Sequence, residues 1–301
     1  MSKRMYLHVL VILFAAASFW PVNAEASDVH YRALGDSLAA GQTPNKEIGA
    51  GYADMIALAL QQSGRLDSFS KQWSFPGYTT EQVLQRLSQE AVRQDLQNAS
   101  LITISAGAND VLPLIKNDHI RGTLSYEAIP VAFALNRVRE NYGKILRELE
   151  RVSPGAEVYA MGYYFPYPHV REQLKPAAGK QMSLLNQVIQ QEAEKAGAHF
   201  VSVEEAFGSD ADRLIPNRSD VHPAPQGYWH MANQFLHVYT NGAVSLPKAV
   251  LKTLPKPVPL SKMRQETEEE EEKQENRNRA NAQPITAAHV KGCDREGNVI
   301  G

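Results

Sequence analysis

The sequence predicts an α/β fold in which a parallel five-stranded sheet is covered by helices. Between Val29 and Tyr239, short apolar runs alternate with longer segments whose apolar residues recur at helical spacing. This alternation is typical of βαβ units, whose strands lie parallel. The expected strands are His30–Leu34, Ser68–Phe75, Leu101–Ser105, Glu157–Gly162 and His199–Val203. The expected helices are Tyr52–Ser63, Thr80–Leu96, Leu135–Val152 and Gln181–Ala196.

The two ends of the chain differ from this pattern. A positively charged start precedes an apolar run that ends at Trp20, and Val22-Asn23-Ala24 has the small residues of a cleavage site. We therefore expect a secretory signal peptide over residues 1–24, with an uncleaved membrane anchor as the alternative. Prolines, a run of glutamates and a segment rich in Asn, Arg and Gln predict a mostly disordered tail over 248–301. The folded domain is then expected to span 25–247.

Composition limits the classes of partner. The chain of 301 residues has a net charge of −2 and is 43% hydrophobic, which is ordinary for a globular protein with one core. Without a basic excess, nucleic acid is not expected as a partner. Cys293 is the single cysteine, which rules out an intramolecular disulfide and a cysteine-rich zinc site. We expect a secreted or cell-envelope monomer that meets membranes only through its signal segment or its substrate.

The run Leu34-Gly35-Asp36-Ser37-Leu38 is the first candidate for chemistry. A strand that stops at a glycine and turns into a helix places its serine at the carboxyl edge of the sheet, where parallel α/β proteins gather reactive groups. The positive end of the helix then favours a developing anion. The alternative is a plain turn with a helix cap, because Gly, Asp and Ser are also common in such turns.

Two later strand ends carry candidate donors. Pro76-Gly77-Tyr78 follows the second strand, where a glycine lets the backbone approach another group and its N–H point into the cleft. Thr79 or Thr80 is expected to cap the next helix. Asn109 follows the third strand after Gly107, so its amide can face an oxyanion. Each is equally compatible with an ordinary turn.

A candidate base lies late in the chain, in Ser219-Asp220-Val221-His222-Pro223. In an extended loop, Asp220 and His222 lie on the same side because they are two residues apart. The carboxylate can hold one ring nitrogen and leave the other to accept a proton.

Taken in this order, the four blocks resemble those of the SGNH hydrolase family, also called GDSL esterases and lipases. The blocks are Gly35-Asp36-Ser37-Leu38, Gly77, Gly107-Ala108-Asn109-Asp110 and Asp220-Val221-His222. The second block departs from the family's more common Ser-Gly-Asp but retains the glycine. The first is not the Gly-x-Ser-x-Gly elbow of α/β-hydrolases, because residue 39 is Ala.

The resemblance implies a flavodoxin-like, three-layer α/β/α sandwich and hydrolysis of carboxylic esters through an acyl-enzyme. It implies a nucleophile at Ser37, a base at His222 and an orienting carboxylate at Asp220, roles that the residue chemistry independently favours. The expected oxyanion donors are the Ser37 N–H, the Gly77 N–H and the Asn109 amide. This chemistry needs no metal or organic cofactor.

Two other functions are compatible with parts of the pattern. A metal-dependent phosphoesterase shares the Gly-Asp and Gly-x-Asn-Asp blocks and a late histidine, but needs more His and Asp ligands than these strand ends supply. A secreted, non-catalytic protein that binds cell-wall glycans would keep the fold without the chemistry.

The substrate is left open among lipids, acylated cell-wall polymers and acetylated sugars. The insertion Val111–Leu135 and the aromatic residues of Tyr163–Tyr167 are candidate walls for an acyl chain, or plain packing. His169, next to these aromatic residues, is a further candidate for lining the cleft.

Overall fold

The computed structural model describes residues 29–262, which form a parallel sheet covered on both faces. The sheet order is β3-β1-β4-β7-β8, and every pairing in it is parallel. The strands are β1 (Val29–Gly35), β3 (Leu66–Ser74), β4 (Leu101–Ser105), β7 (Glu157–Met161) and β8 (His199–Val201). All five residues of the central strand β4 are buried, as expected where both faces are covered. The predicted α/β sheet is confirmed.

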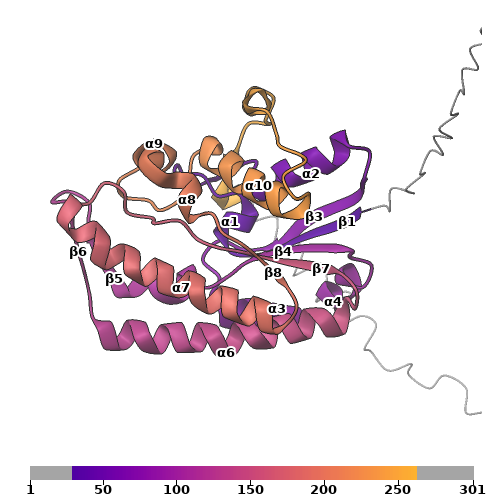
Figure 1. Ribbon diagram of the computed structural model, residues 1–301, viewed down its shortest axis with the longest axis horizontal. Helices are drawn as coiled ribbons and strands as arrows, with labels where there is room; N and C mark the ends of the chain where they lie inside the picture. Colours follow the sequence, from indigo (N-terminus) through magenta and orange to yellow (C-terminus); the bar gives the residue numbers. More distant parts are fainter. Residues whose placement is uncertain (1–28, 263–301) are drawn as a thin grey trace, which may run out of the picture.

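Helices form the two outer layers (Figure 1). One face carries α2 (Tyr52–Gln62) and α10 (Pro225–Tyr239), which contact each other. The other carries α3 (Thr80–Leu87), α6 (Ala128–Val152) and α7 (Lys175–Lys195), with α6 packed between the other two. The shorter helices are α1 (Ser37–Ala40), α4 (Glu90–Leu96), α5 (Ala108–Val111), α8 (Glu204–Phe207) and α9 (Ala211–Leu214).

The expected helix Thr80–Leu96 is two helices in the structure. The Ser88 hydroxyl donates to the carbonyl of Gln85 at 2.6 Å, and Gln89 has extended backbone, so α3 ends before α4 begins. A side-chain hydroxyl that satisfies its own helix end competes with continuation of the helix. The N-cap of α3 is Thr79, one of the two residues expected to cap this helix.

The region Val111–Leu135 is more structured than a simple insertion. It contains a 3-10 turn (Leu112–Leu114), the antiparallel hairpin of β5 (Ile115–Asp118) and β6 (Thr123–Tyr126), and the start of α6. The sequence pattern placed the start of α6 too late, because Ile129 and Phe133 in its first turns are apolar but exposed. Apolar residues on the exposed face obscure the helical spacing of the buried ones.

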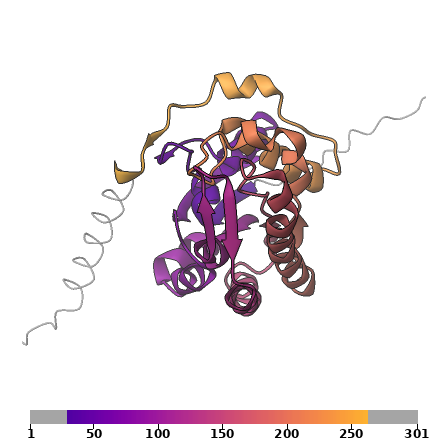
Figure 2. The same cartoon turned by 90° about the vertical axis from the view of Figure 1, so that its left-hand side faces the viewer.

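Ordered elements continue past the expected domain boundary at residue 247. Residues 246–262, which we call the C-terminal strap, continue to pack on the domain and cross one side of it (Figure 2). Within the strap, Val250 of the 3-10 turn η4 (Lys248–Lys252) is buried. Strand β9 (Val258–Pro259) pairs antiparallel with β2 (Glu47–Ile48). The prolines suggested disorder, but a few backbone pairs and buried side chains hold this segment.

The remaining expectations for the chain ends lie outside the described residues. These are the signal peptide over 1–24, the acidic run and Cys293. Across residues 29–262, the helices are all too short or too polar to cross a membrane.

Candidate active site

The serine candidate lies at a sharp turn between β1 and α1. Gly35, the last residue of β1, has φ +125°, and a Cβ there would lie 1.9 Å from the carbonyl oxygen of Ser105. Only glycine therefore allows β1 to pass this close to β4. Ser37 follows two residues later as the first residue of α1. The turn thus delivers the serine to the carboxyl edge of the sheet, as the sequence predicts.

Asp36 stabilises this turn from inside the protein. One carboxylate oxygen accepts hydrogen bonds from the Leu38 N–H at 2.9 Å and the Ser105 hydroxyl at 2.8 Å. The other oxygen accepts from the Tyr163 hydroxyl at 2.6 Å. Burial raises the pKa of this carboxyl, and the hydrogen bonds from Tyr163, Ser105 and Leu38 oppose the rise. The turn that Asp36 caps therefore also places Ser37 on the pocket wall.

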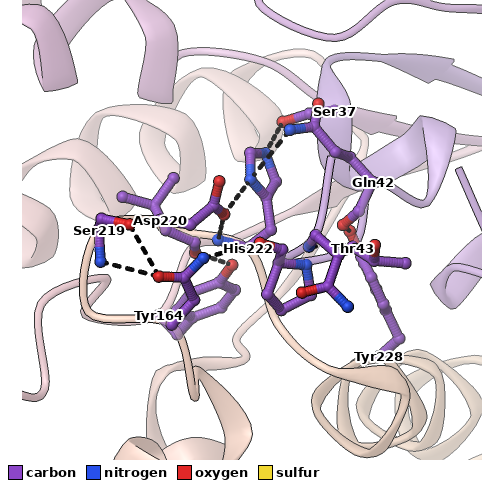
Figure 3. Close-up of polar contacts among 12 residues, drawn as sticks. Ser37, Gln42, Thr43, Tyr164, Ser219, Asp220, His222 and Tyr228 are labelled. Atoms are coloured by element: carbon purple, nitrogen blue, oxygen red, sulfur yellow. Dashed lines mark hydrogen bonds and ion pairs between the residues drawn. The ribbon is translucent and has the colours of Figure 1, made fainter. Parts of the chain in front are cut away.

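His222 connects the serine to a carboxylate (Figure 3). Its Nε2 lies 2.7 Å from Ser37 Oγ, and its Nδ1 lies 2.6 Å from Asp220 Oδ1. The same Asp220 oxygen also accepts the backbone N–H of His222 at 2.8 Å. The two side chains are only 11% and 13% exposed, so solvent screens this pair weakly.

The loop that carries Asp220 is shaped by Asn217. The side-chain oxygen of Asn217 accepts the N–H and the hydroxyl of Ser219, and its backbone carbonyl accepts the N–H of Asp220. The Asn217 amide donates to the carbonyl of Pro44 at 2.9 Å, which ties this late loop to the chain just after α1. The hydroxyl of Tyr164 adds a hydrogen bond to the carbonyl of Val221.

Gly77 and Asn109 lie on the same pocket as Ser37. Gly77 has φ +90°, a left-handed conformation that glycine adopts without strain. The Asn109 amide nitrogen donates to the carbonyl of Tyr78 at 2.9 Å, so the loop after β3 and helix α5 are joined directly. A side-chain amide has two N–H groups, which leaves the second one for another acceptor.

Asp110 reinforces this junction. Its carboxylate accepts the Thr80 N–H at 2.9 Å and the Thr80 hydroxyl at 2.8 Å, at the start of α3. Burial raises the pKa of Asp110, and the two bonds from Thr80 oppose that rise. Sequence reasoning included Asp110 only as part of a block, whereas the structure shows that it holds the Gly77 loop against Asn109.

The family assignment follows from a direct comparison of sequences. A model of the GDSL-like lipase/acylhydrolase family matches residues 33–230 of the 301. The chain belongs to this family. The match includes every residue of the proposed site, and the family's chemistry is hydrolysis of esters through a serine.

Individual relatives are more distant. The uncharacterized protein YpmR of Bacillus subtilis is 24% identical over 199 residues, which cover 65% of this chain and 75% of YpmR. The lipase Lip_vut3 from a goat rumen metagenome is 22% identical, with a TM-score of 0.57 over 71% of this chain and 99% of that one. A mutant of Axe2, an acetyl xylan esterase from Geobacillus stearothermophilus, is 18% identical, with a TM-score of 0.52 over 73% and 98%. These two structures share the SGNH hydrolase fold with this GDSL-family protein.

The pocket of this GDSL-family protein has a volume of about 400 Å³ and is lined by both apolar and polar residues. Of the two candidate walls, the insertion contributes Leu112, and the aromatic segment contributes Tyr163, Tyr164 and Pro166. His169 instead bonds through Nε2 to the carbonyl of Ile215, at 2.7 Å, and does not line the pocket.

Four pocket residues were missed by sequence reasoning: Gln42, Lys46, Met182 and Leu260. The amide nitrogen of Gln42 lies 3.2 Å from His222 Nδ1, although the two residues are 180 positions apart. Leu260 belongs to the C-terminal strap. These residues match no local motif, so the sequence contains no signal that could have found them.

Within 29–262, the structure brings together no group of three or more His, Cys, Asp or Glu side chains that could hold a metal ion.

Proposed function

We propose that this protein is a serine esterase that hydrolyses carboxylic esters through an acyl-enzyme on Ser37. The observation that carries the proposal is the hydrogen-bonded series from Ser37 Oγ through His222 to Asp220, at 2.7 and 2.6 Å. These distances suit proton transfer from the hydroxyl to the ring as the oxygen attacks a carbonyl carbon.

Each residue of the series has a distinct role in the proposed reaction. His222 Nε2 removes the Ser37 proton during attack and returns it to the oxygen of the leaving alcohol. Asp220 keeps the other ring proton on Nδ1 and stabilises the imidazolium. Water then attacks the acyl-enzyme with His222 again as base, which releases the acid and restores Ser37.

The negative charge on the carbonyl oxygen needs donors that are already in place. The Ser37 N–H, the Gly77 N–H and the free N–H of the Asn109 amide supply them from three loops at the sheet edge. Loss of one such donor costs about 3 kcal/mol of transition-state stabilisation. The hydrogen bonds Asn109–Tyr78 and Asp110–Thr80 support this role, because they hold the loops together before substrate binds.

Replacement of the nucleophile tests the proposal. Ser37→Ala is expected to lower kcat for p-nitrophenyl acetate and longer esters by about 10⁴-fold or more. A fluorophosphonate is expected to label the Ser37 peptide of the wild type, as read by mass spectrometry. Ser202→Ala, at an exposed serine outside the site, is the matched control. Unchanged hydrolysis by Ser37→Ala would refute the assignment, and activity lost to a chelator but indifferent to the phosphonate would favour the metal-dependent alternative.

For the substrate, we propose a lipid acyl ester or an acylated carbohydrate outside the cytoplasm. The apolar residues that line part of the pocket support an acyl chain, and the names of the lipase and acetyl xylan esterase relatives support both classes. A series of esters of increasing acyl length, with a phospholipid and acetyl-xylan, separates them. The basic start and apolar run of residues 1–24 support secretion, and a mature N-terminus near Glu25 in the culture medium is the expected result.

A further inference from the structure

The C-terminal strap supplies part of the pocket from outside the matched family region. The match ends at residue 230, whereas Leu260 lines the same pocket as Ser37 and His222. Two hydrogen bonds attach the start of the strap to α10. The indole N–H of Trp229 donates to the carbonyl of Leu246 at 2.9 Å, and the Leu246 N–H donates to the side-chain oxygen of Asn233 at 2.7 Å.

The other end of the strap is joined to the loop that follows the nucleophile helix. Val258 and Pro259 pair with Ile48 and Glu47, and the Leu260 N–H donates to the carbonyl of Lys46 at 3.1 Å. Pro257 approaches Gly49 so closely that a Cβ on the glycine would lie 3.3 Å from it. Leu260 is therefore held at a defined place on the pocket wall.

That loop is itself anchored to the body of the domain. The ammonium group of Lys71 on β3 donates to the carbonyls of Ala40 and Gly49 and to the Asp54 carboxylate, at 3.0, 3.1 and 2.6 Å. A wall attached to such a support keeps its shape, so it can discriminate between ligands of different size.

The position of this wall relative to His222 indicates which part of the substrate it contacts. Gln42 lies 3.2 Å from His222 Nδ1 and starts the tight turn that ends at Ile48, with which it forms a bridge. Lys46 lies within this turn, and Leu260 is bonded to Lys46. His222, Gln42, Lys46 and Leu260 all line the pocket, and the turn from Gln42 to Ile48 connects the histidine contact to the strap.

In the proposed reaction, the leaving group lies on the side of the pocket where His222 is. His222 Nε2 must approach the alcohol oxygen to protonate it, so the alcohol portion of an ester lies next to the histidine. The oxyanion donors Gly77 and Asn109 come from the loops after β3 and β4 instead. We propose that the C-terminal strap forms the leaving-group wall of the pocket and that Leu260 selects the alcohol portion of the ester. This inference rests on the proposed serine-esterase function.

Two ester series measured on the full-length protein test the proposal. One series keeps a butyryl group and varies the alcohol from ethanol to cyclohexanol and 1-naphthol. The other keeps ethanol and varies the acyl group from acetyl to hexanoyl. Leu260→Ala is expected to raise kcat/KM for the bulky alcohols relative to ethanol by about fivefold or more, and Leu260→Trp to lower this ratio similarly. Both variants are expected to leave the ratios within the acyl series unchanged within about twofold.

The control is Val258→Ala on the same strap, where the side chain is 44% exposed and does not line the pocket. It is expected to leave both series unchanged. The proposal is overturned if the Leu260 variants change the acyl series instead, change both equally, or change neither. Thermal unfolding of each variant checks that the fold is intact, and Leu260→Ala remains informative if the tryptophan variant does not fold. Wild-type turnover that depends on Ser37 would show that the proposed function stands even if this inference fails.

Discussion

Removal of the Tyr163 hydroxyl probes the buried carboxylate beneath the nucleophile. Asp36 is 1% exposed, and Tyr163, itself 3% exposed, donates to one of its oxygens at 2.6 Å. Tyr163→Phe deletes that donor and leaves the ring in place. The oxygen loses its hydrogen bond without gaining contact with water, because the site stays buried.

The expected cost follows from the charge on the acceptor. A hydrogen bond to a charged group contributes about 1.5–3 kcal/mol, so Tyr163→Phe should lower the free energy of unfolding near neutral pH by about that much. Tyr142→Phe is the matched control: among the described residues, the buried Tyr142 hydroxyl has no hydrogen-bond partner. Its removal should be neutral or stabilising, since a buried polar group without a partner is itself a cost.

The cost should also depend on pH. Burial raises the folded-state pKa of Asp36, so its protonation favours folding: this contribution is fully present below the unfolded pKa of ~3.9 and is lost as pH rises through the folded pKa. The Tyr163 bond opposes the rise because it stabilises the carboxylate. Without it the folded pKa rises further, and the deficit of Tyr163→Phe grows from low to neutral pH.

Urea unfolding followed by tryptophan fluorescence, at pH 5 and pH 8, measures both effects. The reasoning is refuted if Tyr163→Phe and Tyr142→Phe cost the same within about 0.5 kcal/mol, a margin below the contribution of one such bond. It is also refuted if the deficit of Tyr163→Phe is larger at pH 5 than at pH 8.

Two further substitutions test how the site is held. Gly35→Ala should prevent stable folding, because its Cβ would overlap the Ser105 carbonyl oxygen. Gly64→Ala, where φ is +69° and the space around the glycine is open, should cost only about 1–2 kcal/mol of backbone strain. Thermal unfolding compares the two variants, and an equal loss of stability would contradict the steric argument. Asp110→Ala should lower the free energy of unfolding by about 1–3 kcal/mol, because it leaves the N–H and hydroxyl of Thr80 without their acceptor. It should also lower kcat for esters more than it raises KM. Steady-state kinetics in which KM alone changed would contradict this prediction.

The strands could be read from the sequence because their signal is local. A fully buried run such as Leu101–Ser105 followed by Gly107 indicates a parallel strand and its end within a few residues. Every end of a predicted strand lies within two residues of the observed end. The helix ends were less predictable. The break at Ser88 depends on one side-chain hydrogen bond, and the first turns of α6 carry exposed apolar residues that obscure the helical pattern.

The order of the four blocks was likewise enough to indicate which residues would meet. Strand ends of a parallel sheet lie at one edge, so residues that follow β1, β3 and β4 are brought together whatever the intervening helices contain. This is why Ser37, Gly77 and Asn109 could be placed on one site without coordinates.

By itself, then, the sequence determined the α/β class, the family and the residues that carry the proposed chemistry, because each is written in a short stretch of chain. Only the tertiary structure decided what surrounds them. The Asp36–Tyr163 hydrogen bond joins residues 127 positions apart, and the Gln42–His222 contact joins residues 180 apart. The wall at Leu260 depends on a strap that returns to pair with β2. Such contacts follow from the path of the whole chain, and they leave no periodicity or motif in the sequence.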